Sequence, residues 1–187
     1  MEHDERFPLH EETNAPEEAV PTLQHSAQSL GKIPNLEKVM ASAPPLLKGY
    51  WALWDLFEQT SLTPAEQQVV YLVANFENNC SYCVPWHTLL AKMAKLEAAH
   101  IAALRAGTEL PDSKLNALAV YSRALIEHRG HPPKEATDAF FAAGYGPQQA
   151  LEVVLGLAVK VMSNYTNGIA GTPLDEQVEH LKWTKPS

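Results

Sequence analysis

Helix-start signals followed by apolar patterns of helical period recur along this chain. The strongest is Thr63-Pro64-Ala65-Glu66, in which Thr63 suits the N-cap, Pro64 suits the first helical position, and Glu66 stands where a capping box requires it. No convincing run of alternating β-branched residues bounded by turns occurs in the 187 residues. The sequence therefore predicts an all-α fold.

Apolar periodicity predicts a series of helices in a body that starts near residue 31. They cover residues 35–42, 46–59, 64–76, a segment from near the cysteines to 95, and then 97–105, 112–127, 133–143 and 147–163. Residues 1–30 lack a sustained period and are rich in Glu, Pro, His and Thr. We therefore expect an extended or poorly ordered arm over 1–30 and one helical domain over 31–187.

Most of the formal charge of −8 lies in the arm, where residues 1–20 hold seven acids and only Arg6 as a base. The body carries no cluster of Lys and Arg, so nucleic acid is not an expected partner. The N-terminus is acidic where a secretory signal would be basic and then apolar. The longest apolar stretch, residues 150–162, is too short to span a bilayer. We expect a cytoplasmic protein without a membrane partner.

The residues that point to chemistry are Cys80, Cys83 and His87. Their spacing puts them within about 60° of arc on one helical face. Asn79 is a good N-cap candidate, which would place both sulfurs in the first turn of a helix. A helix N-terminus or a nearby imidazolium lowers a thiol pKa from roughly 8.5. The pattern predicts a reactive thiol, a second thiol within disulfide reach, and a proton carrier.

Three other interpretations of the cysteine pair are weaker. A structural disulfide would close too short a loop to stabilise the fold much, and such bonds are rare in a reducing compartment. A structural zinc would need a fourth ligand beyond the two cysteines and His87, and no second pair of ligands is apparent. Inert buried thiols would not be expected among polar neighbours such as Asn78, Asn79 and Ser81. We expect no metal and no cofactor.

Pro85 lies between Cys83 and His87, where it would remove one helical hydrogen bond. Either the helix begins late enough to place Pro85 in its first turn, or it is kinked beside the sulfurs.

Several segments together resemble the alkylhydroperoxidase AhpD and carboxymuconolactone decarboxylase family. They are residues 31–35 (GKIPN), 44–47 (PPLL), 63–71 (TPAEQQVVY), 77–83 (ENNCSYC), His87-Thr88, 164–167 (NYTN) and 171–175 (GTPLD). The resemblance spans roughly residues 30–176 and implies a multihelical fold, assembly into trimers or hexamers, and peroxide reduction. It also implies that Cys83 attacks the peroxide, that Cys80 condenses with the sulfenic acid, that an external dithiol or protein reductant opens the disulfide, and that His87 relays protons.

The sequence departs from the family at Gln68, twelve residues before Cys80, where the best-characterised hydroperoxidases carry a glutamate that acts as a base. Gln68 cannot accept a proton. Glu77 and Glu66 are the carboxylates that could substitute, and we favour Glu77. A solvated turn residue is an equally good interpretation of Glu77.

Six aromatic residues are candidates to line an apolar entrance that would suit an organic hydroperoxide. They are Tyr50, Trp51, Trp54, Phe57, Tyr82 and Trp86. Core packing is the commoner role of such residues, and their number could equally reflect a buried subunit interface.

A weak internal echo, offset by 83 residues, matches Pro64 with Pro147 and Tyr82 with Tyr165. A duplicated unit and a coincidence between similar helices explain it about equally well. Two rival functions also stay open at this point. One is a lactone decarboxylase-like enzyme of the same fold, and the other is a non-catalytic oligomer whose thiols sense oxidants or exchange disulfides.

Overall fold

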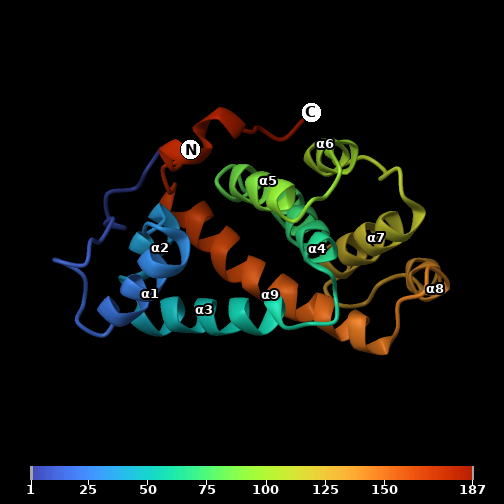
Figure 1. Cartoon of the computed structure of the whole chain (residues 1–187), viewed down its shortest axis with the longest axis horizontal. Coiled ribbons are helices and arrows are strands. Elements are labelled where there is room, and N and C mark those ends of the chain that lie inside the picture. The colour runs from blue at the N-terminus through green and yellow to red at the C-terminus, as the bar shows by residue number, and fades with distance from the viewer. Residues whose placement is uncertain (1, 187) are drawn as a thin grey trace.

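Helices make up all the regular secondary structure of residues 2–186, the part of the chain that the computed structural model describes, and no strand occurs there (Figure 1). The elements are α1 (Val20–Leu30), α2 (Asn35–Met40), α3 (Pro44–Glu58), α4 (Pro64–Glu77), α5 (Cys83–Met93), α6 (Ala98–Ala106), α7 (Ser113–Glu127), α8 (Lys134–Ala142), α9 (Pro147–Ala170) and the 3-10 helix η1 (Glu176–Leu181). The predicted all-α fold is confirmed.

Local capping sets the start of α4, the helix boundary that the sequence predicts most sharply. The backbone N–H of Glu66 donates to the Thr63 hydroxyl, and the Glu66 carboxylate accepts from the backbone N–H of Thr63 at 2.8 Å. This is the expected capping box, with Pro64 as the first residue of α4. In the same way, Asp112 caps α7 by accepting from the backbone N–H of Leu115 at 2.8 Å.

Helix α9 runs to Ala170 and so extends past its predicted end at Ser163. Its last turns contain Asn164 and Asn167, which have low helix propensity but are buried. The Asn164 amide donates to Asn75 Oδ1 on α4 at 2.9 Å, which ties this segment to the core. Tertiary hydrogen bonds therefore override the local preference that the sequence analysis relied on.

The expectation of an extended or poorly ordered arm is wrong for residues 20–30, which form α1. Leu23 and Ser26 are fully buried, and the His25 ring packs edge-on against Trp51 of α3 with centroids 4.8 Å apart. Only a narrow stripe of α1 is apolar, so no sustained period marks it in the sequence. The residues before α1 also contact the body: the backbone N–H of Asp4 donates to the Ala170 carbonyl at 2.9 Å.

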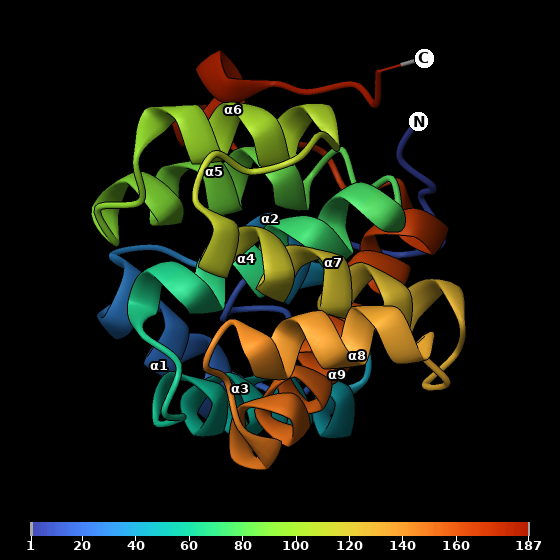
Figure 2. The same ribbon diagram turned by 90° about the vertical axis from the view of Figure 1, so that its right-hand side faces the viewer.

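The core is built around α4 and α9, which pack against each other and against most of the remaining helices (Figures 1 and 2). Helix α4 also packs on α5, α6 and α7, while α9 packs on α2 and α3. Gly156 permits the close approach of α9 to α3, because a Cβ atom there would lie 2.6 Å from the Phe57 ring. The result is that α3, α4, α5 and α9 surround one region of the interior.

The echo at an offset of 83 residues does not correspond to equivalent environments. Tyr82 is buried, whereas Tyr165 is 59% exposed on the outer side of α9. None of the helices within residues 2–186 is both long and apolar enough to cross a membrane.

Candidate active site

Helix α5 begins at Cys83, so the prediction that Asn79 caps it is wrong. Asn79 has a left-handed backbone (φ 51°), and its N–H donates to the Phe76 carbonyl, which ends α4. Cys80 therefore lies in the turn before α5, and only Cys83 lies in the first helical turn. Pro85 falls in that turn as well, as expected for a helix that begins late.

Asp175 fixes the turn between the two cysteines from the far end of the chain. Its Oδ2 atom accepts hydrogen bonds from the Tyr82 hydroxyl and from Trp86 Nε1, the latter at 3.0 Å. Lys32 Nζ lies 3.2 Å from the other carboxylate oxygen. Because Asp175 is itself buried, these bonds are shielded from water and hold the start of α5 in place.

The two sulfurs lie close together and are both free thiols. The backbone N–H of Cys83 donates to Cys80 Sγ at 3.2 Å. The side-chain amide of Asn167 donates to Cys83 Sγ at 3.2 Å and to Cys80 Sγ at 3.8 Å. Asn167 thus bridges the pair from α9, although in the sequence it stands out only as part of the supporting segment 164–167.

His87 is buried and bonded at both ring nitrogens. Lys160 Nζ lies 2.8 Å from Nε2, and Nδ1 lies 2.9 Å from Gln68 Oε1. Because an ammonium group can only donate, Nε2 is the acceptor and the ring hydrogen is on Nδ1, where it donates to Gln68. Gln68 therefore fixes the histidine tautomer, although it cannot exchange a proton.

Lys160 is the main site residue that sequence reasoning missed. Its side chain is 1% exposed and has no carboxylate within ion-pair distance in the described part of the chain. A buried, unpaired ammonium is costly and is typical of a functional site. The available signal was a single lysine within the apolar stretch 150–162.

The surroundings shift the pKa values of the two thiols in opposite directions. Burial alone would raise the pKa of Cys83, but the hydrogen bond from the Cys80 thiol, the positive charge of Lys160 and the amide of Asn167 outweigh it and lower this pKa to about 6. Burial raises the pKa of Cys80 well above its ordinary value. Burial and the charge of Lys160 lower the pKa of His87, which keeps the imidazole neutral. Cys83 is therefore the more acidic thiol of the pair.

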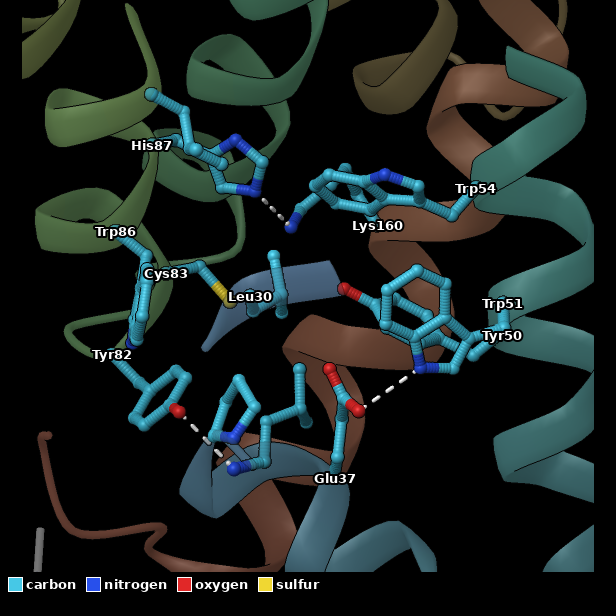
Figure 3. A pocket seen from close by; sticks show the side chains of 13 residues that line it. Leu30, Glu37, Tyr50, Trp51, Trp54, Tyr82, Cys83, Trp86, His87 and Lys160 are labelled. Atoms are coloured by element: carbon cyan, nitrogen blue, oxygen red, sulfur yellow. Dashed lines mark hydrogen bonds between the residues drawn. The ribbon is translucent and has the colours of Figure 1, made fainter. Parts of the chain in front are cut away.

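Cys83 faces an apolar pocket with a cavity volume of about 60 Å³ (Figure 3). This is several times the roughly 10–15 Å³ that one water requires. The pocket is lined by Leu30, Pro34, Leu36, Glu37, Tyr50, Trp51, Trp54, Tyr82, Cys83, Trp86, His87, Leu90 and Lys160. Five of the six aromatic candidates are among them, while Phe57 lies fully buried in the core. Glu37 was not anticipated from the sequence.

The structure does not bring Glu77 or Glu66 to His87. Arg123 Nε on α7 donates to the Glu77 carboxylate at 2.7 Å, so Glu77 is placed for an ion pair. Glu66 caps α4 and accepts from the Tyr145 hydroxyl at 2.9 Å. Neither carboxylate lines the pocket. Within residues 2–186, no three His, Cys, Asp or Glu side chains are grouped so that they could hold a metal ion.

The segment that carries this site has a recognisable family pattern. Residues 44–123 match the sequence model of the carboxymuconolactone decarboxylase family, and they include both cysteines and His87. Over this segment the chain is similar to the carboxymuconolactone decarboxylase family. Lys160 and Asn167 lie beyond the matched residues, on α9.

Solved structures share this fold over nearly the whole chain. An AhpD-core, peroxidase-related protein from Ralstonia eutropha JMP134 has a TM-score of 0.80 at 16% identity, covering 92% of this chain and 93% of its own. A peroxidase-related protein from Silicibacter sp. TM1040 has a TM-score of 0.78 at 14% identity, covering 94% and 93%. A cysteine-to-alanine variant of the debrominase Bmp8 in complex with 2,3,4-tribromopyrrole has a TM-score of 0.78 at 16% identity, covering 95% of each chain. No curated protein sequence matches this chain significantly.

Cys80 lies on a second cavity, separate from the apolar pocket. Its volume is also about 60 Å³, and it is lined by Asn78, Asn79, Cys80, Ser81, Tyr82, Asn164, Asn167, Gly168, Gly171 and Thr172. Most of these residues are polar or small, in contrast to the aromatic walls around Cys83. The two thiols thus face two different environments.

Proposed function

We propose that the chain is a thiol-dependent peroxidase that reduces organic hydroperoxides through Cys80 and Cys83. The observation that carries this proposal is the Cys83 sulfur at the wall of an apolar pocket, with its pKa lowered to about 6. A thiolate at neutral pH is the nucleophile that peroxide reduction needs. The match of residues 44–123 to the carboxymuconolactone decarboxylase family supports an enzyme of this type.

In the first step, the Cys83 thiolate attacks the terminal oxygen of the hydroperoxide. A sulfur–oxygen bond forms, the oxygen–oxygen bond breaks, the sulfur loses two electrons, and the alcohol leaves after taking up a proton. Cys83 becomes a sulfenic acid. The Lys160 ammonium and the Asn167 amide stabilise the thiolate before attack.

In the second step, the Cys80 sulfur attacks the Cys83 sulfenic acid, a disulfide forms, and the hydroxyl leaves as water with the proton from Cys80. Burial lowers the pKa of Lys160, which makes its proton easier to give up. His87 Nε2 is 2.8 Å away and accepts the hydrogen bond from this ammonium. We assign this relay of protons to Lys160 and His87, with Gln68 holding the ring.

An external dithiol or protein reductant would then open the disulfide. Two thiols of the reductant become a disulfide, and Cys80 and Cys83 return to the reduced state. The polar cavity beside Cys80 supports entry of the reductant from that side, while the hydroperoxide uses the apolar pocket.

We also propose a cytoplasmic homo-oligomer, a trimer or a hexamer. Several large apolar side chains of α9 are exposed, which is typical of a surface that contacts another subunit. They are Leu151, Val154, Val161, Tyr165 and Ile169. Light scattering of the purified protein would measure the subunit number, and a monomer would contradict this part of the proposal.

The proposal is tested by turnover of cumene hydroperoxide with dithiothreitol as reductant. We expect Cys83→Ser to abolish activity, and Cys80→Ser to lose turnover while still forming a sulfenic acid that dimedone traps. Sulfenic acid on Cys80 in the Cys83→Ser protein would reverse the two roles. Undiminished activity in both variants would reject the proposal.

Two rival functions have distinct outcomes in the same assay. A decarboxylase-like enzyme would use the pocket without the thiols, and both variants would then keep their activity toward an acidic ring substrate. A redox sensor would oxidise once without steady turnover. Because the debrominase shares this fold, release of bromide from 2,3,4-tribromopyrrole is a further assay. Bromide release without peroxide turnover would favour a debrominase over a peroxidase.

A further inference from the structure

Glu37 is a buried carboxyl group inside the apolar pocket. It lies on α2 and is 3% exposed, and it is the only acidic residue among those that line the pocket. Figure 3 shows its carboxylate reaching into the pocket from α2, while Cys83 enters from α5 and Lys160 from α9. The carboxyl group and the thiolate thus share one cavity.

The surroundings of Glu37 leave it able to act on a ligand. One carboxylate oxygen accepts a hydrogen bond from Trp51 Nε1 at 2.9 Å. The Ser26 hydroxyl of α1 also interacts with the carboxyl group, and the carboxyl group has no ion pair within residues 2–186. The nearby lysines of α2 and the preceding loop are engaged elsewhere, Lys38 with Glu11 and Lys32 with Asp175. A structural role in an ion pair therefore does not explain why a carboxyl group is buried here.

We propose that Glu37 is the general acid that protonates the leaving group when Cys83 attacks a substrate in this pocket. This inference rests on the proposed peroxidase function and adds a catalytic residue to it. The chemistry calls for such a group because an alkoxide is a poor leaving group, and in an apolar pocket there is little water to protonate it.

The Cys83 thiolate forms a bond to the terminal oxygen of the hydroperoxide, the oxygen–oxygen bond breaks, and the Glu37 proton moves to the departing oxygen to give the alcohol. The products are the Cys83 sulfenic acid, the alcohol and the Glu37 carboxylate. Reduction of the later disulfide by the external dithiol supplies the proton that restores Glu37.

The ionisation state of Glu37 agrees with this role. Burial raises its pKa to about 7, so a large fraction is protonated where Cys83, with a pKa of about 6, is already a thiolate. One group is a base and the other an acid in the same pH range, which is the arrangement that acid–base catalysis requires.

The other titratable or charged groups around the carboxyl group come from each packed element. They are His25 of α1, Lys32 of the following loop, Tyr50 of α3, Tyr82, Cys83 and His87 of α5, Lys160 of α9, and Asp175 before η1. Burial moves the pKa of Tyr50 and Tyr82 far above neutrality, and burial with the charge of Lys160 moves that of His87 well below it. We therefore expect kcat/KM for an alkyl hydroperoxide to rise with ionisation of Cys83 and to fall with ionisation of Glu37.

The test compares two oxidants with different leaving groups. t-Butyl hydroperoxide releases a strongly basic alkoxide, whereas peracetic acid releases acetate, which leaves without a proton. The measurement is the single-turnover rate of thiol oxidation in the reduced protein. For Glu37→Gln, which retains an oxygen for Trp51, we expect a loss of about 100-fold with t-butyl hydroperoxide and less than about threefold with peracetic acid. The alkaline limb of the pH profile should disappear as well.

Two variants make the comparison specific. Glu37→Asp keeps an acid at the site and should recover part of the rate with t-butyl hydroperoxide. Glu179→Gln makes the same chemical change on the exposed surface of η1 and should match the unsubstituted protein with both oxidants. Alkylation of Cys83 by iodoacetamide should be retained in Glu37→Gln, which shows that the thiolate is intact.

The outcomes separate the two proposals. Equal losses with both oxidants, or full activity of Glu37→Gln with t-butyl hydroperoxide, would overturn the role of Glu37 and leave the peroxidase function standing. If the unsubstituted protein reduced neither oxidant, the peroxidase function would itself be rejected, and the role of Glu37 with it.

Discussion

Lys160 Nζ lies 2.8 Å from Nε2 of His87 in the interior of the protein, where the two side chains are 1% and 3% exposed. A neutral imidazole can accept this hydrogen bond but cannot neutralise the ammonium charge. The ionised Cys83 is the negative group that acts on Lys160, and it opposes the lowering of the Lys160 pKa by burial. The cation thus connects the proton carrier to the nucleophile.

Replacing Lys160 by methionine removes the cation and keeps most of the volume. We expect the pKa of Cys83 to rise from about 6 by at least about one unit, which reduces its thiolate reactivity at pH 6 about fivefold or more. The pH dependence of iodoacetamide alkylation measures this shift. Thermal stability should stay constant or increase, because a buried charge is replaced by an apolar side chain. An unchanged alkylation profile would show that Lys160 does not activate Cys83.

Gln68→Glu places a carboxylate beside Nδ1 of His87. The added negative charge favours the imidazolium, so we expect the pKa of His87 to rise from its lowered position. The same charge disfavours the nearby thiolate, and the pKa of Cys83 should rise too. NMR titration of the His87 ring and thiol alkylation measure the two shifts. Gln59→Glu, on the exposed end of α3, is the control, and a fall in the Cys83 pKa would contradict the charge argument.

Glu37 should make the stability of the protein depend on pH. Its pKa rises from 4.5 to about 7 on folding, so the folded state binds more protons than the unfolded state between these values. Its contribution is fully present below about pH 4.5 and is lost as the pH rises through about 7. The expected loss is about 3 kcal/mol in the free energy of unfolding.

Urea unfolding at pH 5 and pH 8 measures this dependence. Glu37→Gln should show a smaller decrease between the two pH values than the unsubstituted chain, because glutamine does not titrate. The same decrease in both proteins would mean that Glu37 does not titrate with a raised pKa.

Gly168 offers a way to separate the two half-reactions. It lines the cavity beside Cys80, and a Cβ atom there meets nothing within 4 Å. Gly168→Leu should therefore fill part of the polar cavity without strain. We expect reduction of the Cys80–Cys83 disulfide by dithiothreitol to slow about tenfold, a cost of about 1.4 kcal/mol in activation free energy. Single-turnover oxidation by cumene hydroperoxide should keep its rate. Slowing of oxidation alone would place reductant entry elsewhere.

Local signals determined much of what could be predicted. The cap at Thr63, the glycine and proline boundaries and the apolar periods depend on residues a few positions apart, and they located most helices. The Cys80, Cys83 and His87 pattern is similarly local, although the turn at Asn79 shifted the start of α5 so that Cys80 lies before the helix. A left-handed asparagine and a capping asparagine look alike in sequence.

The remaining parts of the site depend on contacts between distant segments. Lys160 meets His87 across 73 positions, and Asn167 meets Cys83 across 84. No periodicity in the sequence reports which buried polar residues face each other across α4, α5 and α9. The place of Glu37 in the pocket could not be predicted for the same reason, because Trp51 and Cys83 come from other helices.

The geometry of the candidate active site depends on Asp175. Tyr82, Trp86 and the backbone of Asn35 all donate to its carboxylate, although Asp175 follows the last long helix. A fragment that stopped at Ala170 would keep all nine α-helices of the described residues, yet it would leave the inter-cysteine turn without its anchor. Transplanting the Cys80–His87 segment into another helical scaffold would therefore transfer the reactive groups without the support that orients them.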